Sequence, residues 1–130
     1  MEVILRDEKQ DTPAVHLDKE KGIFEISGKS FPADVGAFFS PITLWLDQYA
    51  EAPNDETVFV MRMDYFNTAS SKVILDILYK LEDMKLDGNY VKVKWYYPDD
   101  DEDMLETGEE YDEIVDVDFE LIEYSVEYDD

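Results

Sequence analysis

The stretch "MRMDYFNTASSKVILDIL" (residues 61–78) decides the fold, because it joins two different hydrophobic periods. Apolar residues alternate up to Asn67, as in a β-strand, and then recur every three or four residues, as in an amphipathic helix. We predict a strand over Thr57–Phe66 and a helix over Ser70–Met84. Within the strand, Tyr65 is expected on the same buried face as the two methionines.

More segments with regular patterns surround this unit. We predict an N-terminal hairpin formed by Ala14–Asp18 and Ile23–Ser27, followed by an aromatic-rich helix over residues 31–51. Two later alternating strands are predicted over residues 90–97 and 115–124. Pro41 lies inside the first helix and is expected to kink or split it. The acidic stretch between the last two strands is a further candidate helix.

This order of elements predicts one α/β domain spanning residues 1–130. Helices that separate strands indicate parallel crossovers, and the alternating strands indicate a sheet with one uncovered face. We expect a five-stranded mixed sheet with helices packed mainly on one face. Residues 1–12 are expected to be a loose arm, and residues 125–130 an acidic tail.

Composition excludes several classes of function. The formal net charge of −23 repels nucleic acid and anionic membranes. Cysteine is absent, which excludes thiol chemistry and disulfides. We expect a cytoplasmic protein with no signal peptide and no cofactor. The acidity has two interpretations that composition does not separate, namely solubility or salt adaptation, and attraction to a basic partner.

Three hydroxyls at the predicted strand-to-helix junction are the main candidate site. They belong to Thr68, Ser70 and Ser71. In one interpretation they only cap the helix, which contributes about 1 kcal/mol. In the other, one hydroxyl is phosphorylated, and the positive end of the helix dipole partly stabilises the phosphate. A nucleophilic serine is disfavoured for two reasons. The only histidine, His16, lies in a distant predicted strand, and the sequence contains no G-x-S-x-G motif.

The acidic stretch "DDDEDMLETGEE" (residues 99–110) also suggests a calcium loop. Its acids have EF-hand spacing, but Met104 stands where such a loop needs glycine, so we favour a solvated, acidic helix start. The candidate calcium ligands would be Asp99, Asp101, Asp103 and Glu110.

The strand over residues 90–97 is expected to bury Trp95 and Tyr97. Its other face would be half exposed on the helix-free side, with Tyr90, Lys92, Lys94 and Tyr96. On the preceding strand, Arg62 and Asp64 are expected to form an ion pair.

Several segments together resemble the bacterial SiaC-type regulatory phosphoproteins. The family has a Tyr-Leu-Asn-Thr-Ser-Ser-like loop, a lysine, an apolar helix and a later strand ending in Trp-Tyr/His-Tyr. The corresponding segments here are "YFNTASSKVILDIL" (65–78) and "VKVKWYY" (91–97), and "GKSFPADVGAFFSPITLWLDQY" (28–49) also fits. The resemblance covers about Thr12 to Glu123, with Ala69 where the family often has serine.

The resemblance implies a STAS-like fold, similar to anti-sigma-factor antagonists, and a non-catalytic switch. A cognate protein kinase would phosphorylate Thr68 and a PP2C-type phosphatase would remove the phosphate. The unmodified form would bind and stimulate a diguanylate cyclase in biofilm control. The surrounding switch and partner-binding residues would be Asn67, Ser70, Ser71 and Lys72. The alternative function is an acidic adaptor or inhibitor that binds a basic partner constitutively, without phosphorylation.

Overall fold

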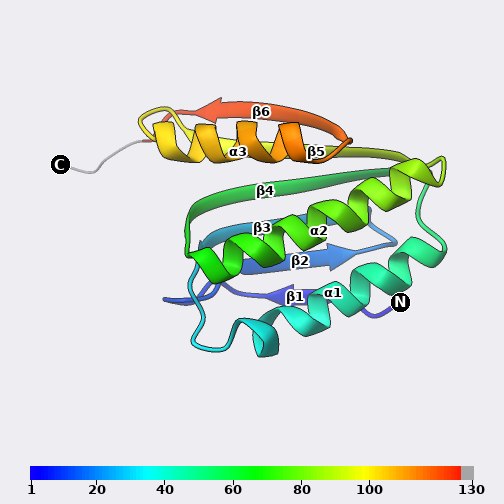
Figure 1. Ribbon diagram of the computed structural model, residues 1–130. Coiled ribbons are helices and arrows are strands. Elements are labelled where there is room, and N and C mark those ends of the chain that lie inside the picture. The colour runs from blue at the N-terminus through cyan, green and yellow to red at the C-terminus, as the bar shows by residue number, and fades with distance from the viewer. Residues whose placement is uncertain (127–130) are drawn as a thin grey trace.

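Strands and helices alternate along most of the chain (Figure 1). The computed structural model describes residues 1–126. The predicted strand–helix unit is present, and its helix is longer than expected at both ends. The elements are β1 (Ile4–Arg6), β2 (Ala14–Asp18), β3 (Ile23–Ser30), α1 (Val35–Glu51), β4 (Glu56–Phe66), α2 (Thr68–Leu86), β5 (Tyr90–Pro98), α3 (Glu102–Ile114) and β6 (Asp118–Tyr124).

The strands form one sheet in sequence order, from β1 at one edge to β6 at the other. Strands β1, β2 and β3 pair antiparallel, whereas β3 to β6 pair parallel. The predicted mixed sheet is therefore confirmed. The predicted number of strands is wrong, because the described sheet has six strands and not five.

The additional strand is β1, in the segment predicted to be a loose arm. Ile4 pairs with Leu17 of β2, and the Arg6 guanidinium donates to the Phe38 carbonyl oxygen at 3.1 Å and lies over the Phe38 ring. The Trp45 indole donates to the Glu2 carbonyl oxygen at 2.6 Å. These contacts with α1 hold the strand, and they join residues too distant in sequence for a local pattern to reveal them.

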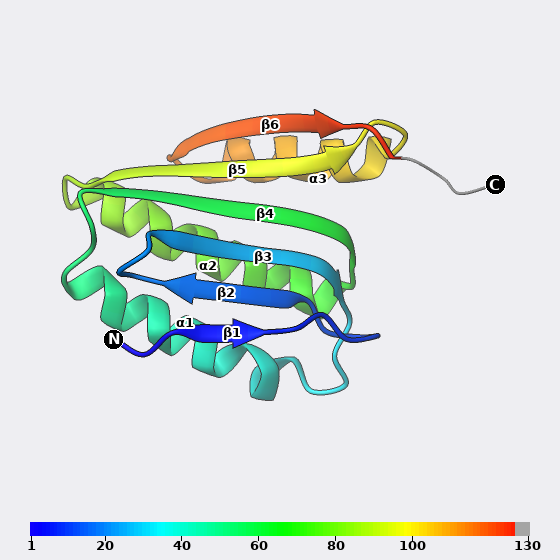
Figure 2. The same ribbon diagram turned by 180° about the vertical axis from the view of Figure 1, so that it is seen from behind.

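All the helices lie on one face of the sheet, as Figures 1 and 2 show from opposite sides. Each of them connects two neighbouring parallel strands, and each connection steps in the same direction along the sheet. Because such crossovers share one hand, they place successive helices on the same side. Within residues 1–126, the opposite face therefore carries no helix, as predicted.

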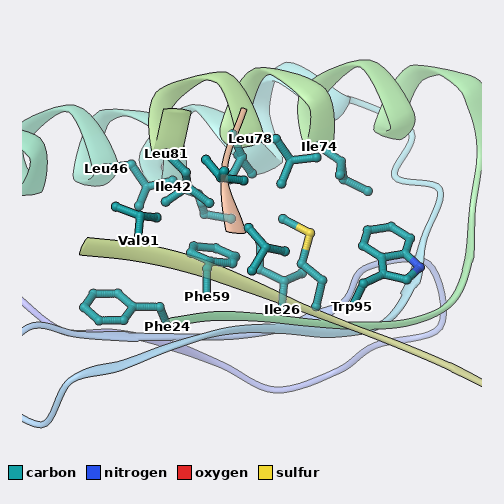
Figure 3. Packing of buried hydrophobic residues seen from close by; sticks show 14 of the residues in the cluster. Phe24, Ile26, Ile42, Leu46, Phe59, Ile74, Leu78, Leu81, Val91 and Trp95 are labelled. Atoms are coloured by element: carbon teal, nitrogen blue, oxygen red, sulfur yellow. The ribbon is translucent and has the colours of Figure 1, made fainter. Parts of the chain in front are cut away.

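The core lies between the helices and the sheet (Figure 3). Phe59 and Val91 point from the sheet towards the helices, and both are buried together with Leu78 of α2. Helix α1 continues past Pro41, so it is not split there. The exposed proline removes one helical hydrogen bond, while buried residues on both sides, Phe39 and Ile42, hold the helix against the core.

At the C-terminal end, Ser125 and Val126 have no regular secondary structure, and the rest of the predicted acidic tail lies outside the described residues. Within residues 1–126, each helix is too short or too polar to cross a membrane.

Gly108 provides a test of how α3 packs. A Cβ atom at Gly108 would lie 2.6 Å from the Trp95 ring and 2.7 Å from Leu121, so there is no room for it. We expect Gly108→Ala to lower the free energy of unfolding by about 1–3 kcal/mol, because overpacking outweighs the better helix propensity of alanine. Urea unfolding measures the change.

The matched control is Gly36→Ala in α1, where an added Cβ would meet only ordinary contacts. We expect this variant to be neutral or more stable by up to about 1 kcal/mol. Equal effects of the two substitutions would contradict the close approach of α3 to the sheet.

Candidate functional site

The junction between β4 and α2 is built around Asn67. Its backbone is extended, and its side-chain oxygen accepts from the Ser70 backbone N–H at 2.9 Å, which caps α2. Its own N–H donates to the carbonyl oxygen of Ser30, the last residue of β3, at 3.0 Å. One residue therefore ends a strand, starts a helix and ties both to the neighbouring strand.

A pair of buried hydroxyls strengthens this connection. The Oγ atoms of Ser30 and Ser70 lie 2.8 Å apart, and both side chains are fully buried. Because the two hydroxyls share a hydrogen bond, the apolar core tolerates them. We assign Ser70 to positioning the loop, in place of the partner contact predicted from the sequence, because no docking protein reaches a fully buried side chain.

Thr68 differs from the two serines of the junction. It is exposed at the first position of α2, and its hydroxyl has no hydrogen bond to any residue in the described part of the chain. Ser71 is half-buried, and its hydroxyl donates to the Thr68 carbonyl oxygen at 2.7 Å. The structure thus separates the three hydroxyls into one buried, one bonded to the helix backbone and one free at the surface.

Thr68 lies on a surface pocket between α2 and α3. The pocket has a volume of about 300 Å³ and is lined by Phe66, Asn67, Thr68, Ser71, Thr107, Glu110 and Tyr111. The Tyr111 hydroxyl donates to the Ser71 carbonyl oxygen at 2.9 Å and so joins α3 to the first turn of α2. Burial raises the pKa of Tyr111 to about 12, so this hydroxyl stays a donor at physiological pH.

The charges around the junction are unusual for this protein. The first turn of α2 has no acidic residue and its cap is the neutral Asn67, whereas α1 and α3 are capped by Asp34 and Asp101. The positive end of the α2 dipole is therefore not neutralised by a carboxylate of its own first turn. The exposed Lys72 lies four residues after Thr68, one helical turn away on the same surface.

The acidic stretch before α3 is a helix start rather than a calcium loop. The Asp101 carboxylate accepts from the Met104 N–H at 3.0 Å, and Glu102 and Asp103 occupy the first turn. Among residues 1–126, no group of three or more acidic or histidine side chains is arranged to hold a metal ion. The predicted acidic helix start is therefore confirmed by the cap and the first turn of α3.

Two other predictions concern the strands. Trp95 is buried as expected, and its indole donates to the Met104 carbonyl oxygen at 3.1 Å. The expected ion pair of Arg62 with Asp64 is not among the ion pairs of the described residues. The Arg62 guanidinium lies instead 4.1 Å from the centre of the Tyr124 ring, a partner that sequence separation concealed.

Local sequence patterns did not identify some residues at the junction. Ser30 and Tyr111 reach it from elements distant in sequence, so no local motif identifies them. Tyr65 was predicted to be buried, but it is 52% exposed, because the register between β3 and β4 shifts just before it.

Comparison with known proteins assigns the family. The model of the SiaC family of regulatory phosphoproteins matches residues 6–124. The chain belongs to the SiaC family. A curated relative, an uncharacterized protein of Pseudomonas aeruginosa, is 30% identical over 104 residues, which are 80% of this chain and 82% of the relative.

Solved SiaC structures share the fold of this SiaC-family chain. Apo-SiaC of Pseudomonas aeruginosa is 28% identical with a TM-score of 0.84, over 94% of this chain and 99% of that one. SiaC in complex with the diguanylate cyclase SiaD, of which it is the activator, is 27% identical with a TM-score of 0.87, over 93% of this chain and 99% of that one. The predicted family resemblance is therefore confirmed.

The buried hydroxyl pair of this SiaC-family chain makes a stability prediction. We expect Ser30→Ala or Ser70→Ala to lower the free energy of unfolding by about 1–3 kcal/mol, because each leaves the other hydroxyl buried without its partner. The double variant should lose less than the sum of the two, since it removes both polar groups. Chemical denaturation of the four proteins measures this coupling.

Ser71→Ala is the control, because its hydroxyl bonds only the adjacent backbone near the surface. Its effect should be within about 0.5 kcal/mol. Strict additivity of the Ser30 and Ser70 substitutions would contradict a direct interaction between the two hydroxyls.

Proposed function

We propose that this SiaC-family protein is a partner switch that acts by binding and is controlled by phosphorylation of Thr68. A cognate protein kinase adds the phosphate and a PP2C-type phosphatase removes it. The unmodified form binds and activates an output protein, a diguanylate cyclase, and so controls biofilm formation. The exposed, unbonded Thr68 hydroxyl at the start of α2 is the observation that carries this assignment.

The accessibility of the three hydroxyls supports Thr68 over its neighbours. Ser70 is fully buried, and a kinase would have to unfold the junction to reach it. The Ser71 hydroxyl already donates to the Thr68 carbonyl oxygen. Thr68 alone of the three is both exposed and free of a hydrogen bond within the described residues, so phosphorylation there leaves the fold intact.

The surroundings of Thr68 explain how a phosphate is tolerated. A phosphothreonine carries about −1.5 to −2 charges at neutral pH. The first turn of α2 has no carboxylate, and Lys72 follows one turn later, so both the helix dipole and a cation stabilise the added charge. Glu110 on the opposite wall of the pocket repels it, which directs the phosphate towards solvent and towards a docked partner.

The relation to the known SiaC–SiaD complex supports the choice of output. SiaC of Pseudomonas aeruginosa is the activator of the diguanylate cyclase SiaD in that complex, and it shares the fold of this chain. Asn67, Ser71 and Lys72 would form the partner surface with Thr68, while Ser70 holds the loop from inside.

Phosphorylation of purified protein by the cognate kinase tests the site. Phosphopeptide mass spectrometry should find one phosphate, on Thr68, because it is the accessible hydroxyl of the junction. Thr68→Ala should abolish incorporation while keeping the circular dichroism spectrum, and the matched Ser71→Ala variant should still be modified. A phosphate on Ser71, or full incorporation into Thr68→Ala, would show that the site is elsewhere.

Binding to the host's SiaD-like diguanylate cyclase tests the switch. We expect calorimetry to measure at least about tenfold weaker binding for the phosphorylated protein, because the added dianion must be desolvated at the interface. Cyclase activation should fall in parallel. The net charge of −23 also permits a constitutive acidic adaptor. A constitutive adaptor would bind its partner with equal affinity whether or not Thr68 is phosphorylated, and this affinity would fall steeply as the salt concentration rises.

A further inference from the structure

A register shift reverses the alternation of β4 just before the candidate site. Gly28 of β3 pairs with Met63, but the next residue, Lys29, pairs with Tyr65, so Asp64 is an extra residue in β4. Gly28 has a φ of 106°, a conformation that side chains rarely allow. Bulges are uncommon between parallel strands and often redirect a side chain next to a functional site.

The redirected side chain is Tyr65. Met61 and Met63 are 1% exposed on the helix side of the sheet, and strict alternation would place Tyr65 there as well. Instead Tyr65 is 52% exposed. The shift therefore moves a large aromatic side chain from the core to the surface, three residues before Thr68.

Tyr65 has an aromatic neighbour at the surface. The ring of Phe31 lies 6.0 Å from the ring of Tyr65 in an edge-to-face arrangement, and Phe31 is also exposed. We call these two residues the aromatic pair. Large aromatic side chains commonly anchor protein–protein interfaces. Tyr90 and Leu86 are comparably exposed, but they lie near the opposite end of the sheet.

Hydrogen bonds hold the segment around Phe31 against the start of α2. The Phe31 N–H donates to the Asp11 carbonyl oxygen at 2.9 Å, and the preceding Ser30 accepts from Asn67 and contacts Ser70. The ends of β3 and β4 lie beside the start of α2 in Figure 2. Three residues span at most about 11 Å, so Tyr65 and Thr68 are close enough for one partner to contact both.

Acidic residues flank the aromatic pair. Asp64 precedes Tyr65 in the bulge, Asp34 follows Phe31 at the start of α1, and both are exposed. Within three residues of either ring along the chain, the exposed cations are Lys29 and Arg62, and the Arg62 guanidinium lies over the Tyr124 ring. A complementary partner surface would therefore offer an apolar side chain surrounded by basic groups.

We propose that Phe31 and Tyr65 are the apolar anchor on which the output protein docks beside Thr68, through an aliphatic side chain of the partner that is flanked by lysine or arginine. This proposal rests on the proposed function and specifies its binding surface. A standard interface buries about 800 Å² on each partner, so one centred on the aromatic pair also covers Thr68. A phosphate there lies within the contact, where its charge requires desolvation.

Alanine substitutions test the anchor in the full chain. We expect Tyr65→Ala and Phe31→Ala each to weaken binding of the SiaD-like cyclase at least about tenfold in calorimetry. Tyr90→Ala is the matched control, because Tyr90 is 49% exposed at the far end of the sheet, and it should stay within about twofold. Tyr65→Phe should keep most of the affinity, because it preserves the ring.

The basic rim of the partner has a separate test that does not touch the rings. Asp64→Lys should weaken binding and flatten its salt dependence, because it places a cation against cations. Thermal unfolding verifies that each variant is folded. Should Phe31→Ala prove unstable, Tyr65→Ala and Asp64→Lys still decide the question.

The outcomes separate this proposal from the proposed function. Normal binding by the Tyr65→Ala and Phe31→Ala variants, with weak binding by phosphorylated wild type, would reject the anchor and keep the Thr68 switch. Equal binding by phosphorylated and unmodified wild type would reject the switch itself. Equal losses in Tyr65→Ala and Tyr90→Ala would mean that the docking surface is not localised at the aromatic pair.

Discussion

The hydrogen bonds between the end of β3 and the start of α2 are the constraint on which the rest of this structure depends. The Ser30 carbonyl oxygen accepts from Asn67, and the Ser30 hydroxyl meets that of Ser70 in the core. These bonds fix the first turn of α2 against a strand that is about 40 residues earlier in the chain. Thr68 is thereby displayed on a rigid frame, so a modification changes the surface without requiring a change of fold.

The arrangement of the sheet, with its helices on one face, determines where the junction between β4 and α2 lies. Every helix lies on one face, because each parallel crossover steps in the same direction. The carboxyl ends of the neighbouring strands β3 and β4 lie at the same end of the sheet. Helix α2 begins at this end, where open α/β sheets commonly present their binding residues. The bulge at Asp64 lies at this end of the sheet and brings Tyr65 to the surface. The strand ends, the helix start and the exposed aromatic rings thus coincide.

The sequence allowed much of the fold to be predicted, because hydrophobic period is a local property. The alternation of β4 and the helical spacing of α2 were visible, and so was the hairpin of β2 and β3. Strand β1 was missed, since its three residues are too few for a pattern and contacts with α1 hold it in place. The predicted orientation of Tyr65 was wrong, because strict alternation along a strand assumes a regular register with its neighbour. The register shift between β3 and β4 breaks that alternation.

The location of the candidate site could be predicted from the sequence, but the different roles of its three hydroxyl groups could not. Three hydroxyls near a helix start suggested a modified loop, and the SiaC likeness indicated Thr68. Only the packing separates buried Ser70 from exposed Thr68, because the distinction depends on Ser30 from another strand. The same limit hid Tyr111, whose hydroxyl reaches Ser71 from α3.

The large negative charge constrains how a phosphate at Thr68 can act. A chain of net charge −23 that gains about two more charges changes its overall field by less than a tenth, and salt screens that field beyond roughly 8 Å. Long-range repulsion is therefore a poor basis for a switch in this protein. The phosphate has to act where a partner removes water from it, at short range and in low dielectric. The proposed docking surface therefore has to include the first turn of α2, close in sequence to Tyr65 of the aromatic pair.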